Sequence, residues 1–117
     1  MNIPFTTSAT CVLDAAGAGQ VRIGPMHSAE TWAVRRVAVR VAPVPPATAP
    51  VLEPEARVYR GAAVDEMMVD GTYTGSTNST GVDLQMMPGD VITVAWVYGD
   101  PGATATATVS GTKTVPG

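Results

Sequence analysis

The sequence predicts an all-β protein, an antiparallel β-sandwich or jelly-roll-like fold of about eight short strands in a single domain. Ten Pro and twelve Gly among 117 residues interrupt almost every window long enough for a helix. The β-formers Val and Thr dominate the segments between these breaks. Residues 103–109 alternate Ala with Thr, which is the pattern of a strand with one buried and one solvated face.

The first half of the chain contains four predicted strands, over residues 9–14, 20–24, 31–42 and 56–61. A Gly-rich turn at 15–19 separates the first two. In the third, strict alternation places Trp32, Val34, Arg36, Ala38 and Arg40 on one face and Ala33, Arg35, Val37, Val39 and Val41 on the other. Both faces are partly apolar, so we expect a central strand or one whose surroundings change along its length. Trp32 is the expected core anchor.

Residues 43–54 contain five prolines, among them Pro45 and Pro46. Such a segment favours an extended, polyproline-like conformation and cannot pair as an inner strand. We interpret it as a loop that crosses from one sheet to the other, or as an arm that leaves the domain.

The second half alternates short strands with turns. The expected elements are a short strand or helical turn at 62–69, a strand or corner at 70–75, a polar loop at 76–81, and strands at 82–87, 91–98 and 103–109. Pro88-Gly89 suits a type II turn. Trp96 and Tyr98 share a strand face with Ile92 and Val94, which predicts that all of them lie in the core.

The residues that usually perform chemistry are scarce. His27, followed by Ser28, is the only histidine, and Cys11 is the only cysteine, so a catalytic triad, a zinc site and an internal disulfide are not supported. The carboxylates lack the Asp-x-Asp-x-Asp spacing of a calcium loop, and Asp70, Asp90 and Asp100 are expected to cap turns. The sequence therefore predicts a protein that is not an enzyme and has no cofactor or metal.

Charge is low and unevenly distributed. Residues 1–60 carry six Arg against four carboxylates, a net charge of +2, whereas residues 61–117 carry one Lys against six carboxylates, a net charge of −5. The acidic total of −3 argues against nucleic-acid binding. No apolar run approaches the length of a membrane helix, and no secretory signal is recognised, so we expect synthesis in a cytoplasm.

Residues 56–112 resemble small proteins encoded among the structural genes of tailed bacteriophages that infect actinobacteria. The segments that carry the resemblance are ARVYR (56–60), VDGTYTG (69–75), MPGD (87–90) and AWVYGDPGATATATV (95–109), and TWAVRRVAV (31–39) fits it as well. The likeness is one of pattern and brings no catalytic signature. It implies a head decoration, fibre or minor tail component with a compact β-sandwich domain.

The expected function is that of a virion structural protein, most simply a capsid decoration protein that braces the shell exterior. Its partners would be copies of itself in a symmetric oligomer, such as a trimer, and a major capsid or tail protein. The candidate contact residues are Arg35, Arg36, Arg40, Pro45, Pro46, Met67 and Met68. The alternatives are a minor tail or fibre component, or a carbohydrate-binding module for host wall glycans that uses Trp32 or Trp96.

Overall fold

The Ala–Thr alternation near the C-terminus belongs to strand β8 (Thr104–Thr114), which lies inside one of two sheets. Ala103, Ala105 and Ala107 are buried, and the threonines between them lie on the outer face. The computed structural model describes residues 2–25, 29–46, 48, 51–61, 65–74 and 77–115. Apart from one short 3-10 helix, the regular structure of these residues is entirely β.

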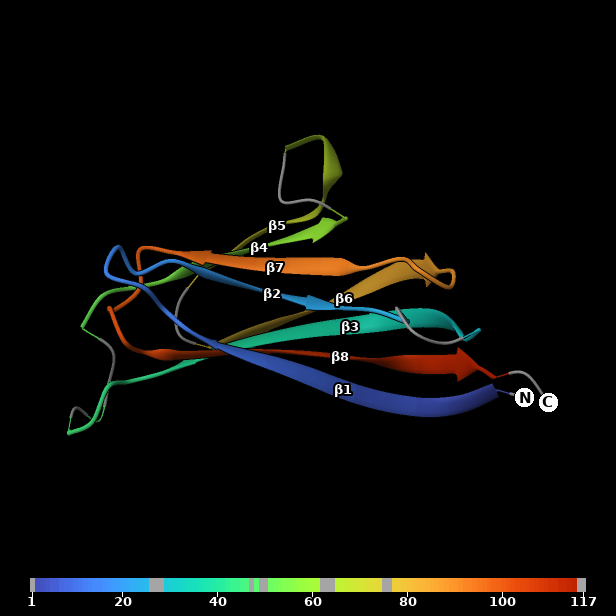
Figure 1. Cartoon of the computed structure of the whole chain (residues 1–117), viewed down its shortest axis with the longest axis horizontal. Helices are drawn as coiled ribbons and strands as arrows, with labels where there is room; N and C mark the ends of the chain where they lie inside the picture. The colour runs from blue at the N-terminus through green and yellow to red at the C-terminus, as the bar shows by residue number, and fades with distance from the viewer. Residues whose placement is uncertain are drawn as a thin grey trace.

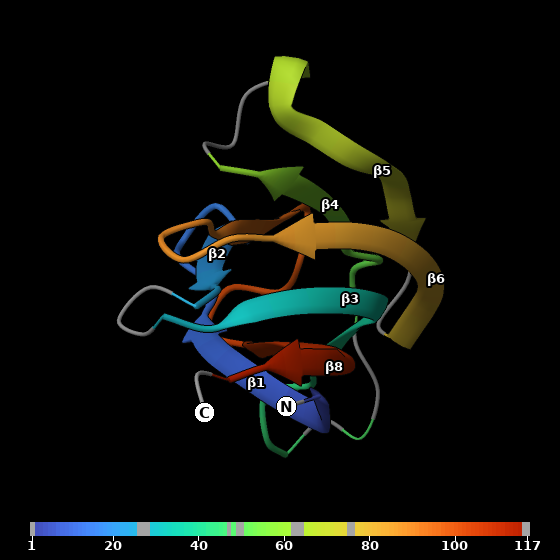
Figure 2. The same cartoon turned by 90° about the vertical axis from the view of Figure 1, so that its right-hand side faces the viewer.

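Eight strands form two four-stranded antiparallel sheets (Figures 1 and 2). The first sheet has the order β1-β8-β3-β6 and the second has the order β2-β7-β4-β5. The other strands are β1 (Asn2–Val12), β2 (Gly19–Ile23), β3 (Thr31–Ala42), β4 (Glu55–Arg60), β5 (Met68–Thr74), β6 (Thr77–Met86) and β7 (Ile92–Val97); the helix η1 covers Asp65–Met67. This order is the jelly-roll arrangement, so the predicted fold class is confirmed.

The core lies between the two sheets and consists largely of Val and Ala. Trp96 of β7 is its largest fully buried side chain, at 1% exposure, and Trp32 is buried near the start of β3. Trp32 packs against Phe5 of β1 with ring centroids 4.6 Å apart. Because fully burying a Val-sized side chain contributes about 1.5–3 kcal/mol, such a core can hold the fold without disulfides.

A β-bulge changes the facing of β3, and the strict alternation expected for this strand was wrong. The register of β3 shifts between Val34 and Arg36 against both neighbouring strands. The extra residue reverses the facing of everything after it, so Trp32 and Val34 share the buried face with Val37, Val39 and Val41. Arg35 and Arg36 are both exposed, and Arg40 also points outward.

Further strands differ from the expected boundaries. β8 continues to Thr114 and does not end at residue 109, and β5 (Met68–Thr74) spans parts of the two elements expected at 62–69 and 70–75. β1 begins at Asn2 and not at residue 9, because it is an edge strand in which Pro4 needs no N–H for the ladder. The polar loop expected at 76–81 was wrong from Thr77 onward, where β6 pairs with β3. Its Thr-Asn-Ser-Thr-Gly sequence has weak β-propensity, so cross-strand pairing decides its structure.

The turns follow the expected chemistry. Asp90 N donates to Met87 O at 3.0 Å across Pro88-Gly89, and Gly89 has a φ of 91°, as a type II turn requires. The same geometry recurs at 100–103, where Ala103 N donates to Asp100 O and Gly102 has a φ of 84°. The carboxylates of Asp90 and Asp100 accept backbone N–H groups, as predicted, whereas the Asp70 side chain lies outside the described part of the chain.

Candidate functional site

Three connections between strands meet at one end of the sandwich, the left-hand end in Figure 1. They are the β1–β2 turn (residues 13–18), the β3–β4 segment (43–54) and the β7–β8 turn (98–103). The 43–54 segment joins β3 of the first sheet to β4 of the second. We call this surface the loop end.

Backbone hydrogen bonds join the β1–β2 and β7–β8 turns. Leu13 N donates to Ala103 O at 2.8 Å, and Gly102 N donates to Leu13 O at 2.9 Å. Gly99 N donates to Gly17 O at 3.0 Å. The Asp14 carboxylate accepts from the N–H groups of Ala16 and Ala18 and so closes the β1–β2 turn on itself. The two turns are therefore a single hydrogen-bonded unit.

Asp100 ties the 43–54 segment to this unit. Its two carboxylate oxygens accept hydrogen bonds from Val51 N at 2.8 Å and Leu52 N at 2.9 Å. Pro54, the last residue of the segment, is fully buried. The described part of the segment is thus held at both the Asp100 carboxylate and the core.

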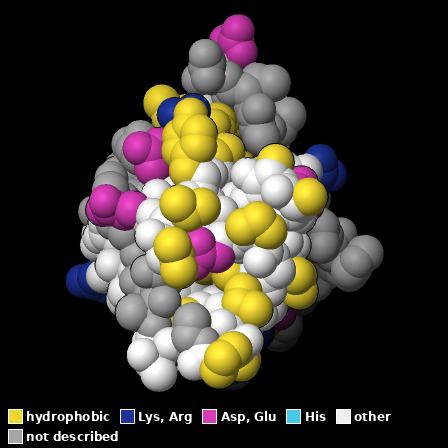
Figure 3. Space-filling view, turned by 90° about the vertical axis from the view of Figure 1, so that its left-hand side faces the viewer, with side chains coloured by type: hydrophobic (Ala, Val, Ile, Leu, Met, Phe, Trp, Pro, Cys, Tyr) yellow, Lys and Arg dark blue, Asp and Glu magenta, His cyan; other side chains and the backbone are white. Residues whose placement is uncertain are grey.

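Large apolar side chains are exposed on the loop end. Val51 is 83% exposed, Val12 65%, Tyr98 64% and Leu52 49%. Pro45, Pro46 and Pro101 are exposed as well. Figure 3 looks directly at this end and shows apolar side chains gathered over it, with acidic groups between them. A grouped apolar surface of this kind usually marks an interaction site.

Tyr98 is the conformational outlier of the loop end. Its φ of 63° is the only positive value among the described residues other than glycine. The sequence-based prediction that Tyr98 shares the core face with Trp96 was wrong, because β7 ends at Val97 and this backbone conformation turns the side chain to solvent. Left-handed backbone costs a non-glycine residue about 1–3 kcal/mol and persists only where neighbouring structure imposes it.

The residue after Tyr98 is closely packed. A Cβ atom on Gly99 would overlap the Leu13 side chain and would lie 3.5 Å from Cβ of Pro54. Gly99 is therefore clamped between the β1–β2 turn and the end of the 43–54 segment. The exposed Tyr98 ring therefore stands directly before a closely packed backbone position.

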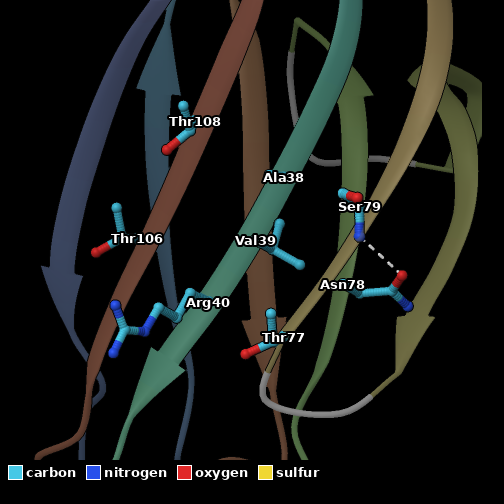
Figure 4. A pocket seen from close by; sticks show the side chains of 8 residues that line it. All are labelled: Ala38, Val39, Arg40, Thr77, Asn78, Ser79, Thr106 and Thr108. Carbon is cyan, nitrogen blue, oxygen red and sulfur yellow. Dashed lines mark hydrogen bonds between the residues drawn. The ribbon is translucent and has the colours of Figure 1, made fainter.

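A second feature is the outer face of the first sheet, which is rich in hydroxyl groups. Alternate residues of β1, β8 and β6 place Thr and Ser side chains side by side there, and the Thr10 and Thr106 hydroxyls lie 3.1 Å apart. A shallow hollow of about 600 Å³ opens on this face (Figure 4). It is lined by Ala38, Val39, Arg40, Thr77, Asn78, Ser79, Thr106 and Thr108.

The three arginines expected to make contacts all lie on this hydroxyl face. Arg35 pairs with Asp83, and the Arg36 guanidinium donates to Ser79 Oγ at 3.1 Å. Arg40 forms no ion pair or hydrogen bond with the described residues, and in Figure 4 it extends from β3 toward β8. The hollow is therefore the place on this face where a cation remains available to a ligand.

The structure does not gather all the expected contact residues into one surface. Pro45 and Pro46 belong to the loop end, whereas Met67 and Met68 lie where η1 meets β5. Met67 lines a separate hollow of about 310 Å³ beside the ion pair of Arg60 and Asp90. Figures 1 and 2 show η1 and β5 projecting from the second sheet, away from β1.

The two tryptophans considered for glycan binding do not form an exposed aromatic platform. Trp32 is 7% exposed and Trp96 1%, so both belong to the core. The Trp32 indole N–H donates to Glu30 Oε1 at 3.2 Å. Neither ring can stack on a sugar without unfolding the sandwich.

The pKa values of two ionisable groups are shifted. Burial raises the pKa of the Cys11 thiol. The Met87 N–H and then the Arg60 guanidinium lower the pKa of Asp90.

Among the described residues, no three His, Cys, Asp or Glu side chains group together as metal ligands do. His27 and Ser28 lie outside the described residues, and within those residues no helix is long and apolar enough to cross a membrane.

Comparison with known proteins adds little. No protein-family model matches the chain, and no curated protein matches it. The fold is similar to a crystal structure of the Yersinia pseudotuberculosis-derived mitogen (YPM), with a TM-score of 0.47 and 9% identity over 97% of this chain and 88% of that one. At this level of similarity, nothing about function transfers.

The four most exposed apolar residues of the loop end escaped the sequence-based search. Val12 lies within the predicted strand 9–14 and Tyr98 ends the predicted strand 91–98, where alternation alone suggests a half-buried position. Val51 and Leu52 lie in the Pro-rich segment, and their adjacency to five prolines was an available signal. Two adjacent apolar residues in a segment that cannot form an inner strand are not covered by neighbouring strands, so their side chains stay exposed.

Proposed function

We propose that the protein is a non-enzymatic structural protein of a bacteriophage virion, a decoration protein that docks on the capsid exterior through its loop end. The observation that carries the proposal is the group of exposed apolar side chains on a hydrogen-bonded frame, Val12, Val51, Leu52 and Tyr98. The phage assignment itself comes from the sequence resemblance.

The loop end has the composition of an interface. The centres of protein interfaces are depleted in charge and enriched in aromatic residues, and a Tyr held rigidly loses little entropy when it is buried. Asp100 lies among the apolar groups, but both of its oxygens already accept backbone N–H groups. Those hydrogen bonds reduce the cost of removing its carboxylate from water, because a buried charge is tolerated when it is paired.

The hydroxyl face supplies a polar surface beside the loop end. Arg40 and the hydroxyl groups around it suit an acidic, hydrogen-bonding partner surface. Charge complementarity of this kind accelerates encounter and orients the partner more than it adds affinity. The proposed docking therefore combines apolar burial at the loop end with orientation by Arg40.

Mass spectrometry of purified phage particles tests the assignment. A decoration protein is present in many copies, comparable with the major capsid protein. A few copies per particle would point to the minor tail or fibre alternative. Absence from the particle contradicts both versions.

Cosedimentation with particles that lack the protein tests the docking surface. Leu52→Asp places a charge in the centre of the apolar group, and we expect it to weaken particle binding at least tenfold. Thr112→Asp is the matched control, since Thr112 is exposed on the first sheet but distant in sequence from the three connections. Equal binding by the two variants would show that the loop end is not the docking surface.

The hollow on the hydroxyl face supports one alternative, a carbohydrate-binding module. Its hydroxyl, amide and guanidinium groups are those that hydrogen-bond sugars, and the half-buried Ala38 adds apolar contact. Glycan-array binding that Arg40→Ala and Ser79→Ala abolish, and that Leu52→Asp leaves intact, would favour this alternative. Trp32 and Trp96 are unsuitable probes, because their substitution disturbs the core.

A further inference from the structure

The outer edge of β1 is a long row of backbone groups that no strand of the described residues pairs with. β1 is the first strand of its sheet and pairs only with β8 (Figure 2). In the described part of the chain, no other backbone segment hydrogen-bonds to β1 between Asn2 and Cys11. An exposed edge of this kind is a template for another strand.

The hydrogen-bond pattern shows which residues face that edge. Leu13 N donates to Ala103 O, so odd-numbered residues of β1 direct their backbone groups toward β8, and even-numbered residues direct them outward. Pro4 confirms the assignment independently, because it has no N–H to give to Thr112, its partner in β8. The outward residues that carry both a donor and an acceptor are thus Thr6, Ser8 and Thr10.

After Pro4, β1 lacks the features that normally block edge pairing. Its eleven residues include no Asp, Glu, Lys or Arg. Natural edge strands are protected by charges, by prolines or by being very short. The other edge of the same sheet, β6, has such protection in Asp83, which pairs with Arg35. Pro4 protects only the first part of β1 and leaves residues 6–10 open.

We propose that β1 pairs antiparallel with β1 of a second copy, about a two-fold axis that passes through Ser8. In this register, Thr6 lies opposite Thr10 of the second copy, and Ser8 lies opposite Ser8 of the second copy. Each of these residues then exchanges two backbone hydrogen bonds with its partner, and Pro4 falls outside the paired region. No like charges meet, because the strand has none.

The side chains fit this register on both faces. Thr6, Ser8 and Thr10 lie on the hydroxyl face, where opposed Thr and Ser hydroxyls can hydrogen-bond across the strands. On the inner face, Phe5 would meet Cys11 of the second copy. Both side chains are only partly buried in one copy, so pairing would cover apolar surface that is now open.

The dimer would join the two first sheets into one continuous sheet. Because the strands run antiparallel, the two loop ends would point in opposite directions along the sheet. A second copy is favoured as the partner because two copies of this edge match in the Ser8-centred register and carry no charges that would repel one another. This proposal does not depend on the virion assignment.

Sedimentation velocity of the full chain and two lysine variants tests the proposal. Ser8→Lys places two like charges at the two-fold axis, and we expect the dimer to dissociate at least tenfold more readily. Thr112→Lys puts the same charge on β8 of the same sheet, away from the edge, and should leave the dimer unchanged. A monomeric wild-type chain at high micromolar concentration, or a dimer that Ser8→Lys does not weaken, would overturn the proposal.

Disulfide trapping decides the register, and it remains informative if Ser8→Lys fails to fold. Opposed residues of a hydrogen-bonded pair have Cα atoms about 5.5 Å apart, which lies inside the range that a disulfide spans. In a Cys11→Ala background, Ser8→Cys should form a covalent dimer on mild oxidation. Ser110→Cys, one strand away on the same face, should not. Equal trapping of both variants would contradict the Ser8-centred pairing.

Discussion

The carboxylate of Asp100 accepts a hydrogen bond from Leu52 N at 2.9 Å, although 48 residues separate the two in sequence. Its second oxygen accepts one from Val51 N. These bonds connect the turn before β8 to the Pro-rich segment before β4. They place two exposed apolar side chains on a defined surface, so the shape of the loop end depends on one carboxylate.

Replacing that carboxylate should loosen the loop end. We expect Asp100→Ala to lower the free energy of unfolding by about 1–2 kcal/mol, because two charge-assisted hydrogen bonds at an accessible site are lost. Amide hydrogen exchange at Val51 and Leu52 should accelerate more than exchange in β3. Asp83→Ala is the control, since its ion pair with Arg35 is exposed and is worth at most about 1 kcal/mol. A smaller effect at Asp100 than at Asp83 would contradict the assigned role.

The bulge in β3 depends on a glycine in the neighbouring strand. A Cβ atom on Gly111 would overlap the Ala33 carbonyl oxygen, so the backbones approach more closely there than any other residue allows. We expect Gly111→Ala to cost about 2 kcal/mol or more, measured by urea unfolding. Gly81, on the other side of β3, has only ordinary contact with Arg35 O at 3.7 Å. Gly81→Ala should therefore be neutral or slightly stabilising, and a similar loss in both variants would show that the bulge does not require Gly111.

Asp90 should contribute a pH-dependent part of the stability. Its pKa is lowered first by the hydrogen bond from Met87 N and then by Arg60. Because the folded-state pKa lies below the unfolded value of about 3.9, the contribution is present above pH 4 and is lost as the pH falls through the folded pKa. The difference in unfolding free energy between wild type and Asp90→Asn should shrink below pH 4. A carboxyl pKa for Asp90 at or above about 3.9, measured by NMR, would contradict this.

Trp96 should act in folding and not in ligand recognition. It is 1% exposed in the core, and its indole N–H has no hydrogen-bond partner among the residues that the structure describes. We expect Trp96→Ala to cost about 3–5 kcal/mol in unfolding free energy, chiefly through the cavity that it leaves. Thermal unfolding followed by circular dichroism measures this loss. A folded Trp96→Ala variant of near wild-type stability would require a different account of the core.

The sequence was sufficient for the fold class because hydrophobic alternation and turn residues act locally. The Ala–Thr strand, the Pro-Gly turns and the boundaries of β3 all follow from residues close in sequence. Three features could not be predicted, because each involves residues that are distant in sequence. The bulge in β3 lies against Gly111, the start of β6 pairs with β3, and the outward turn of Tyr98 precedes a glycine packed against Leu13. The loop end was missed for the same reason, because only the Asp100 hydrogen bonds and the turn contacts assemble it.

The strained backbone of Tyr98 leads to a prediction that separates stability from binding. Glycine adopts a φ of 63° without the steric penalty that Tyr carries. We therefore expect Tyr98→Gly to raise the unfolding free energy by about 0.5–1 kcal/mol, even though it removes a large side chain. The same variant loses the aromatic group at the loop end, so particle binding in cosedimentation should weaken at least tenfold.

Tyr98→Asn provides the matched comparison for this variant, because Asn also tolerates the left-handed conformation while remaining polar. It too should be as stable as the wild type or more so, and it should bind as weakly as Tyr98→Gly. Most substitutions that weaken binding leave stability unchanged or lower it, so a gain in stability with a loss of binding would identify strain that is retained for docking. Loss of stability in both variants would show instead that the Tyr98 ring packs onto the fold and that its conformation carries no functional strain.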